Sequence, residues 1–514
     1  MRNAVHIFLL LAIPFHVSFS QLPRWFELSA PDQSSLPLSN VINDLVVKGD
    51  TVWVGTGRGL SRTMNGTLWS NFGKADGFKG YGISALAVRN SLVWVAEARS
   101  TREQGEAVSF GEGLYYSTNG GVTWTHVPQP VERSGSTVDT LTYGNNKIRA
   151  LAITVTRSNL TYDIALTSTA VWTANFAGML RKSTDFGRTW SRVILPPDNL
   201  NSISPEMQLN FDLSPTGGAL GLRENLNHRV FSVFASNDSV IWVGTAGGIN
   251  KSTDGGVSWR KFNHQNQLRP ISGNFVVAIN EQRWAGKQIL WAATVNAVDP
   301  SEQRGLSFSD DGGETWSTTL LGEFVHNIAF TDSIVYAATD NGLYRSSDFG
   351  QSWIRSGTIF DPTNLQRIAT RQVYAVAVKG DTVWVGGTDG LAYTLDSPTH
   401  SFGSTWRVFR TYEPVRGSAM TYSYPSPFSP DDEVVRIHYS TYGLSTTVTI
   451  RIFNFAMQPV RTLIQNAPRS GTREHDEIWD GRDDQNQRVA NGVYFYVVEI
   501  AGIDPLWGKI YVVE

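Results

Sequence analysis

Short apolar runs alternate with polar turns along almost the whole chain. One run recurs seven times as a strand that ends in Trp or Tyr followed by small residues: VWVGT, VWVAE, VWTAN, IWVGT, LWAAT, VYAAT and VWVGG, beginning at residues 52, 93, 171, 241, 290, 335 and 383. Another β-rich run precedes each copy, as VYAVAV at residues 373–378 does, with a polar turn such as Gly380-Asp381 between them. Runs rich in β-branched and aromatic residues, bounded by turn residues, predict β-strands. The pattern therefore predicts an all-β protein.

A second phrase, S-x-D-x-G-x-[ST]-W, recurs five times between these strands. The copies are STNGGVTW, STDFGRTW, STDGGVSW, SDDGGETW and SSDFGQSW, at residues 117–124, 183–190, 252–259, 309–316 and 346–353. We expect a tight turn in which the third side chain accepts backbone N–H groups and the Gly takes a positive φ. Trp should begin the next strand.

Each unit thus contains strand A, a turn, strand B, a loop, strand C, the Asp turn and strand D. Four antiparallel strands repeated seven times predict a seven-bladed β-propeller, with six or eight blades as the alternatives. Small residues in strand B suit a strand close to the crowded central axis. The first and last units lack a complete turn motif, since residues 65–69 are one residue short and an insertion separates Asp396 from residues 403–406. Residues 25–28 could add a strand to the last blade.

The recurring turn resembles the Asp box, or BNR repeat. Asp boxes occur in sialidases, in xyloglucanases of the two-propeller type, in sortilin-type receptors and in photosystem II assembly factors. The VWVGT phrase also resembles the propeller repeats of bacterial sensor proteins. Together these resemblances cover residues 22–411, and they imply the fold while leaving the function open.

Composition and charge exclude several classes of function. A net charge of −3 and a pI near 6.3 give no electrostatic footprint for nucleic acid. The chain has no cysteine, which excludes disulfides, zinc–thiolate sites and cysteine nucleophiles. The sequence shows no cofactor motif, and we predict neither a cofactor nor a metal site.

The first twenty residues have the pattern of a signal peptide. Arg2 supplies the positive end, residues 4–17 are mostly apolar, and Ser18 and Ser20 place small residues before a cleavage site at Gln21. An uncleaved anchor is the alternative, and no later stretch is apolar enough to span a membrane. We therefore expect a protein that is secreted or displayed at a bacterial cell surface, with the periplasm also possible.

After Thr411 the repeat stops. A linker is expected over residues 412–422, followed by short alternating strands over residues 423–514. Strands are expected at residues 434–439, 447–453, 460–464, 476–479, 493–500 and 509–513. Six or seven short strands in this length predict an Ig-like β-sandwich.

The C-terminal segment resembles the Ig-like domain of the flagellar hook-capping protein and the type A sorting domains of the bacterial type IX secretion system. The phrases that carry the likeness are YPSPF, IFN, WDGRD, NGVYFY and KIYV, at residues 424–428, 452–454, 479–483, 491–496 and 509–512. Ser426 stands where sorting domains usually have Asn, and residues 485–487 replace a usual Gly. The resemblance implies secretion machinery as a partner. Asp480, Asp483 and Asp484 could bind calcium, but a strand-joining turn is the preferred interpretation.

Long insertions point to one face of the propeller. B–C loops and D-to-A connections open on the same face, and we expect insertions there at residues 98–111, 128–146, 196–227 and 296–304. Clustered excess length suggests a recognition surface, with tolerated decoration as the alternative. Two A–B turns, at residues 156–163 and 282–287, are also expected to be long.

Two functions follow from this face. The leading hypothesis is a binding protein without enzymatic activity, whose partner is a glycan or a cell-envelope protein; a structural scaffold is a related possibility. The alternative is a sialidase-like or other glycoside hydrolase, which would need an arginine cluster and paired carboxylates. The Arg-Ile-Pro signature of sialidases is missing, and no catalytic residue is assigned. The binding candidates in the face loops are Arg58, Arg99, Arg102, Glu103, Arg223, Glu302 and Arg304.

Overall fold

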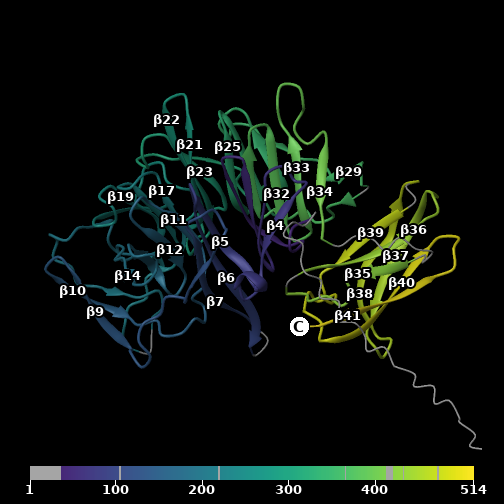
Figure 1. The fold of residues 1–514 in the computed structure, drawn as a ribbon, viewed down its shortest axis with the longest axis horizontal. Helices are drawn as coiled ribbons and strands as arrows, with labels where there is room; N and C mark the ends of the chain where they lie inside the picture. The colour runs from purple at the N-terminus through teal and green to yellow at the C-terminus, as the bar shows by residue number, and fades with distance from the viewer. Residues whose placement is uncertain are drawn as a thin grey trace, which may run out of the picture.

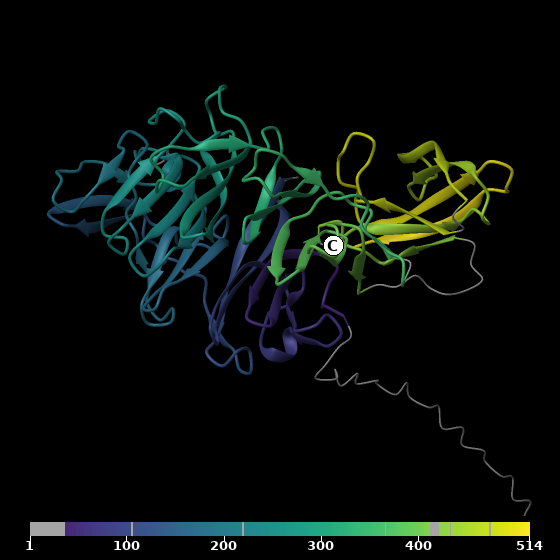
Figure 2. The same ribbon diagram turned by 90° about the horizontal axis from the view of Figure 1, so that it is seen from above.

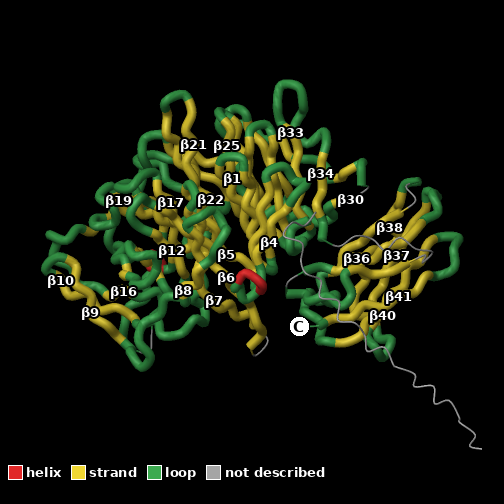
Figure 3. The backbone as a smooth tube through the Cα atoms, in the orientation of Figure 1, coloured by secondary structure: helices red, strands yellow, loops and turns green. Residues whose placement is uncertain are grey.

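The computed structural model describes residues 36–103, 106–217, 220–364, 366–411, 421–431, 433–471 and 474–513. The signal peptide, the extra strand expected at residues 25–28 and most of the linker expected at residues 412–422 lie outside the described residues. The prediction of an all-β protein is confirmed, because strands and turns make up nearly all of the described chain (Figure 3). Two short 3-10 helices, η1 (Lys74–Asp76) and η2 (Leu226–His228), complete it.

Seven antiparallel sheets follow one another along residues 42–409 and form a β-propeller (Figure 1). Strands A to D of the first sheet are β1 (Ile42–Lys48), β2 (Thr51–Thr56), β3 (Gly59–Thr63) and β4 (Trp69–Phe72); those of the second are β5 (Gly82–Arg89), β6 (Leu92–Glu103), β7 (Glu106–Ser117) and β8 (Thr125–Val127). The third sheet has β11 (Thr161–Leu166), β12 (Val171–Asn175), β13 (Met179–Ser183) and β14 (Ser191–Arg192); the fourth has β17 (Val230–Ala235), β18 (Ile241–Thr245), β19 (Gly248–Ser252) and β20 (Trp259–Phe262). The fifth has β21 (Phe275–Trp284), β22 (Lys287–Val295), β23 (Gly305–Ser309) and β24 (Ser317–Thr319); the sixth has β25 (Val325–Thr331), β26 (Ile334–Thr339), β27 (Gly342–Ser346) and β28 (Ile354–Arg355); and the seventh has β31 (Ala375–Lys379), β32 (Thr382–Gly387), β33 (Gly390–Leu395) and β34 (Trp406–Phe409).

The A strands form the inner ring. Each A strand lies beside the A strand of the next sheet, and β31 of the last sheet lies beside β1 of the first, so the ring is closed. Strand B requires small residues because it packs against the A strand of the next sheet. A Cβ added at Gly55 would lie 2.9 Å from Ile83, and one added at Gly386 would overlap Ile42. The crowding expected from the small residues of strand B is therefore present.

The Asp boxes form the predicted turns. In the copy at residues 346–353, the hydroxyl of Ser346 donates to Asp348 (2.8 Å) and accepts the N–H of Gly350 (2.8 Å), while Asp348 accepts the N–H of Ser352 (2.9 Å). The hydroxyl and the N–H of Ser352 hold the pKa of Asp348 at about 2. Gly350 has a φ of +79°, and Trp353 donates its indole N–H to the Gly350 carbonyl (3.2 Å). The turn is thus closed by its own side chains.

Each box also covers a tryptophan of the preceding blade. A Cβ at Gly350 would lie 3.3 Å from the Trp291 indole, and a Cβ at Gly313 would lie 3.2 Å from Trp242. The incomplete turn of the first blade does the same across the closure, since Gly66 lies against Trp384 of the last blade. Six of the seven neighbouring pairs of blades therefore share one repeated contact.

Ser346→Ala should lower the free energy of unfolding by about 1–3 kcal/mol, because it leaves the buried N–H of Gly350 without its acceptor. Urea denaturation of the two proteins measures the difference. Ser347→Ala is the matched control, since Ser347 is exposed and should change stability by less than about 0.5 kcal/mol. Equal effects of the two substitutions would contradict this account of the box.

Two of the expected face loops, at residues 128–146 and 196–227, contribute strands to a sheet whose central strand follows the first of them. β9 (Val138–Tyr143) and β10 (Asn146–Leu151) make a hairpin, and β16 (Asp212–Leu213) joins β10 in parallel. β15 (Ser202–Ile203) extends the fourth blade beyond β20. Ile148, Ala150 and Leu213 pack in one core with Trp172 and Trp259. Alternating apolar residues within the insertions thus build an auxiliary sheet, which lies at the end of the molecule away from the C-terminal domain (Figures 1 and 2).

One of the two long A–B turns is also wrong. Residues 161–166 form strand A of the third blade, so residues 156–160 lead into that strand and its A–B turn is short. At residues 282–287 the extra length lies in the strands, because β21 and β22 stay paired up to Trp284 and Lys287 and only two residues form the turn. The insertion at residues 98–111 continues β6 and β7 as a long two-stranded ribbon.

The C-terminal strands form a β-sandwich. One sheet has the order β35 (Thr421–Tyr424), β36 (Val435–Ser440), β39 (Glu474–Trp479), and the other β38 (Pro459–Arg469), β37 (Thr446–Phe453), β40 (Gly492–Ile500), β41 (Leu506–Val512). Their inner faces enclose a core that includes Ile437, Ile450, Trp479 and Tyr496. The predicted sandwich is therefore present, and its first strand begins at Thr421, two residues before the expected boundary.

A buried ion cluster joins the sandwich to the propeller. Asp389, in the β32–β33 loop, pairs with Arg436 on β36, and Arg410 at the end of the last blade lies 3.6 Å from the same carboxylate. All three side chains are at most 3% exposed. Asp389 also accepts the N–H of Ala369 (2.7 Å), from a segment close to the short hairpin of β29 (Phe360–Asp361) and β30 (Gln366–Arg367). The two domains are thus held by charges that neither surface would bury alone.

Candidate functional site

An irregularity in strand A places one residue of each blade at the start of the inner ring. In six blades the pairing of strands A and B shifts by one residue near the start of strand A, as between Ile42 and Asp44. Such β-bulges leave one extra residue and redirect its side chain. The extra residues, with Tyr374 at the equivalent place in the seventh blade, are Asn43, Ser84, Tyr162, Phe231, Val277, His326 and Tyr374, which we call the bulge ring.

The bulge ring lies at one mouth of a central channel of about 680 Å³. All seven A strands line this channel, and every member of the bulge ring except Phe231 lines it directly. Strand A begins where the D-to-A connections arrive, so the ring lies on the face that carries the long insertions. Concave sites lined by several elements are the usual places for ligands.

An aromatic cluster forms one side of this mouth. The Phe231 ring centroid lies 5.2 Å from that of Tyr162, 4.3 Å from that of Phe275 and 5.9 Å from that of Phe176. Tyr162 is 39% exposed, while Phe231 is buried behind it. Arg229 lies over Phe176 and ion-pairs with Glu224 of the insertion at residues 196–227. Three blades and one insertion therefore support an accessible tyrosine.

Blades six and seven contribute a second aromatic group. The His326 ring lies 4.8 Å from Phe324 and 5.0 Å from Tyr374, and its Nε2 lies 2.8 Å from a carboxylate oxygen of Asp340. Tyr374 donates its hydroxyl to Gln372 (3.3 Å). Because Tyr162 is in the third blade, the two groups lie almost opposite each other around the ring. Asn43 and Ser84, from the first two blades, supply polar groups between them.

Two carboxyl groups line the channel below the ring. Burial raises the pKa of Asp44 and that of Asp163 to about 7, although backbone N–H groups that donate to each carboxylate act in the opposite direction. Asp163 accepts the N–H of Ile164 (2.8 Å) and of Val233 in the next blade (2.9 Å). The carboxyls therefore link strands of the inner ring, and they are only partly ionised near pH 7.

The two groups should make the protein less stable as pH rises. Because the pKa is about 7 in the folded chain and 3.8 for an aspartate in water, each contribution is fully present below pH 4 and is lost as pH rises through 7. The loss is at most about 4 kcal/mol per carboxyl group. Urea unfolding at pH 5 to 8 should show a flatter profile for Asp163→Asn than for the wild type. The control Asp50→Asn, on an exposed turn, should keep the wild-type slope.

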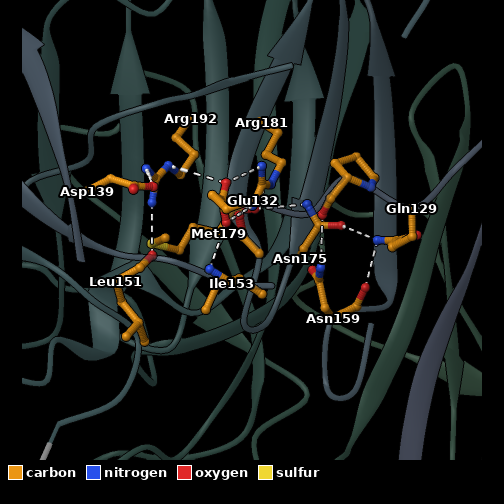
Figure 4. Close-up of polar contacts among 12 residues, drawn as sticks. Gln129, Glu132, Asp139, Leu151, Ile153, Asn159, Asn175, Met179, Arg181 and Arg192 are labelled. Carbon is orange, nitrogen blue, oxygen red and sulfur yellow. Dashed lines mark hydrogen bonds and ion pairs between the residues drawn. The ribbon is translucent and has the colours of Figure 1, made fainter. Parts of the chain in front are cut away.

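The start of the insertion at residues 128–146 is anchored by a nearly buried ion cluster (Figure 4). Glu132 lies 2.8 Å from Arg181 and 3.5 Å from Arg192, and it accepts the N–H of Ile153 (2.7 Å). Burial alone would raise the pKa of Glu132, but the two guanidinium groups and this N–H hold it below its usual value. Arg192 also ion-pairs with Asp139 on β9 (2.6 Å). The insertion is thus fixed to the third blade by charge as well as by its apolar core.

The predicted binding residues lie on several blades and mostly make local pairs. Arg58 faces the C-terminal domain, where its guanidinium lies 3.5 Å from Glu433. Arg99 lies 2.5 Å from Glu112 and stacks over Phe110 on the β6–β7 ribbon. Glu103 ion-pairs with Arg157. Arg102 is on β6, but its side chain lies outside what the structure describes.

The remaining candidates lie around blades four and five. Glu302 is 2% exposed and accepts N–H groups of Asn274 (3.0 and 2.8 Å) and Ala297 (2.6 Å), so its carboxylate holds the β22–β23 loop together. Arg223 is exposed in the insertion at residues 196–227, and Arg304 is exposed and donates to the Gly322 carbonyl (2.6 Å). The seven candidates come from three blades and one inter-blade insertion.

Two further carboxylates also have local partners. Glu97 is buried and accepts the N–H groups of Lys79, Gly80 and Tyr81. In the C-terminal domain, Asp483 accepts two N–H groups of its own turn, from Gln485 and Gln487. Within the described residues, no group of three or more potential ligands is arranged to hold a metal ion. The described part of the chain likewise holds no helix with the length and hydropathy needed to cross a membrane.

The bulge ring was missed in the sequence, although a signal is present there. Buried residues of strand A lie three apart, as in Ile42 and Leu45 or Val325 and Ile328, where an undisturbed strand would bury every second residue. Aligning the seven A strands on this spacing places the ring members in one column. The signal is a break in the alternation of buried and exposed residues, and it becomes recognisable only when the seven units are aligned.

The described residues thus form a propeller with Asp-box turns and a central channel, followed by a C-terminal sandwich. The sequence matches the BNR/Asp-box repeat model over residues 115–126. No curated protein matches the chain. Similar solved structures include YCF48 from Cyanidioschyzon merolae (17% identity, 71% of this chain and 98% of that chain, TM-score 0.41), the GH74 xyloglucanase from Xanthomonas campestris (16%, 79% and 59%, 0.48) and PorZ, a surface component of the type-IX secretion system of Porphyromonas gingivalis (14%, 92% and 87%, 0.33). At these identities the similarity concerns the fold alone.

Proposed function

We propose that the protein is an exported binding protein, without enzymatic activity, that recognises a glycan or a protein at the bulge ring. The observation that carries this proposal is the ring itself, in which one residue from each of six blades lines the mouth of a central channel. Accessible aromatic rings such as Tyr162 offer large contact area at low cost in conformational entropy. The auxiliary sheet and the β6–β7 ribbon extend the same side of the propeller.

The test is a binding screen of residues 21–514 against a glycan array and a panel of purified cell-envelope proteins. Tyr162→Ala and Tyr374→Ala change the two sides of the mouth, and Phe455→Ala, which removes an exposed ring of the sandwich, is the control. Binding that weakens in the two ring variants and persists in the control supports the proposal. Binding that all three variants retain would place the site elsewhere.

The C-terminal sandwich is proposed to serve secretion or surface attachment. Support comes from its position after the propeller and from the phrases that it shares with sorting domains, such as residues 479–483. Expression in a bacterium with the type IX system, with and without residues 421–514, tests this role. Equal amounts of both chains outside the cell would contradict it. A location at the outer surface of the cell belongs to the same proposal.

A glycoside hydrolase remains the second candidate. The carboxyls of Asp44 and Asp163 favour it, because general acid catalysis near neutral pH needs a raised pKa. Both groups, however, accept backbone N–H groups that link blades, which is a structural role. Hydrolysis assays on fluorogenic sialosides and β-glucans decide the matter: turnover that is lost in Asp163→Asn would replace the binding proposal.

A further inference from the structure

The charged residues that line the channel indicate which charge a ligand can carry, which the fold alone does not. Among the described residues that line the channel, Arg89 is the one arginine or lysine, and it stands at the end of β5, on the face opposite the bulge ring. Asp44 and Asp163 lie between the two ends. An anionic ligand entering at the bulge ring would therefore approach carboxyl groups without meeting a guanidinium in the channel wall. Recognition of a carboxylate or phosphate normally uses such a group.

Four members of the bulge ring suit a ligand that is polar but uncharged. On one side, Asn43 donates an amide N–H to the Ile83 carbonyl (3.0 Å) and Ser84 donates its hydroxyl to the Thr161 carbonyl (2.7 Å). The second N–H and the oxygen of the Asn43 amide, and the acceptor lone pairs of the Ser84 hydroxyl, are left for a ligand. Tyr162 and Tyr374 offer phenolic rings on the other sides. A pyranose has one set of C–H bonds that can lie against an aromatic face, whose electron density is negative, and hydroxyls at its edge. An aromatic wall beside short polar side chains matches both features.

We propose that the bulge ring binds the end of a neutral glycan chain, with a sugar ring stacked on Tyr162. This inference rests on the proposed binding function and adds the class of ligand. Phe231 and Phe275, packed behind Tyr162, hold the ring in place, and Arg229 links this cluster to the neighbouring insertion. Asn43 and Ser84 face the sugar hydroxyls. Sugars that carry a carboxylate are disfavoured by Asp44 and Asp163.

Matched oligosaccharides test the class of ligand. Neutral hexose oligosaccharides are titrated into residues 21–514 by calorimetry beside the same compounds with the terminal primary alcohol oxidised to a carboxylate. We expect the neutral member of each pair to bind more tightly. Tyr162→Ala should weaken it by at least about tenfold, whereas Tyr162→Phe, which keeps the ring, should stay within about threefold of the wild type. Phe455→Ala is the control, and thermal melts check that each variant is folded.

The outcomes separate this inference from the proposed function. Tighter binding of the oxidised sugars, still lost in Tyr162→Ala, would overturn the neutral glycan and leave a binding protein. If only a polypeptide bound, and Tyr162→Ala abolished that binding, the neutral-glycan inference would likewise be overturned while the binding function would stand. Should Tyr162→Ala fail to fold, Tyr374→Ala gives the same comparison from the opposite side of the mouth. If none of the sugars or proteins bound at the bulge ring, both the neutral-glycan inference and the proposed binding function would be overturned.

Discussion

Glu132→Ala is expected to lower the free energy of unfolding by about 3–5 kcal/mol, because it leaves two nearly buried guanidinium groups without their shared carboxylate. Arg181 and Arg192 have side chains only 3% and 6% exposed, so water cannot replace the lost partner. The N–H of Ile153 loses its acceptor as well. Urea denaturation measures the loss, and hydrogen exchange should show β9 and β10 opening first.

Two further variants make this expectation specific. Glu106→Ala, at an exposed position of the β6–β7 ribbon, should leave stability within about 0.5 kcal/mol of the wild type. Glu132→Ala combined with Arg181→Met should recover part of the loss, because the double change removes an uncompensated charge. A Glu132→Ala protein as stable as the Glu106→Ala protein would show that the cluster does not hold the insertion.

Gly386→Val is expected to destabilise the propeller strongly. A Cβ at Gly386 would overlap Ile42, which is fully buried where the last blade meets the first. Overpacking costs about 1–3 kcal/mol in a core that can relax, and a ring fixed on both sides has little room to do so. We expect at least about 3 kcal/mol of destabilisation by this argument, and loss of folded protein on heating that begins at the closure.

The control for the closure is Gly357→Val. Gly357 is exposed, and a Cβ there would meet no atom within 4 Å. Its unfolding midpoint should match that of the wild type, whereas Gly386→Val should unfold at lower urea concentration. The same midpoint for both variants would mean that the contact between the last and first blades contributes little to the stability of the ring.

The repeated elements could be predicted from the sequence because they depend on local chemistry. The Asp box closes on its own side chains, and the small residues of strand B report a local lack of space. The auxiliary sheet could not be placed in the same way, because Ile148, before the third blade, and Leu213, in the insertion after it, come together only when both pack in one core with Trp172. Length alone therefore suggested loops where the alternation of apolar residues builds strands.

The bulge ring escapes prediction from the sequence for a related reason. Charged residues in long loops are the conspicuous candidates there. In the structure Arg99 makes its ion pair on its own ribbon, Glu103 pairs with the neighbouring Arg157, and Glu302 accepts N–H groups within its own loop. The ring members attract no attention singly, because Tyr162 or His326 looks like any aromatic residue of a strand. Their common position depends on a one-residue slip in pairing, repeated around a closed ring. That slip appears only when the blades are compared.

The ion cluster at Asp389 bears on how the protein presents its channel. A sandwich on a loose tether would let the propeller turn freely about its point of attachment. Arg410 of the propeller and Arg436 of the sandwich instead pair with the same carboxylate, so the two domains are held in one relative orientation. If the C-terminal domain anchors the chain, as proposed, this cluster and the pair of Arg58 with Glu433 would help to fix the direction in which the bulge ring faces relative to the anchor.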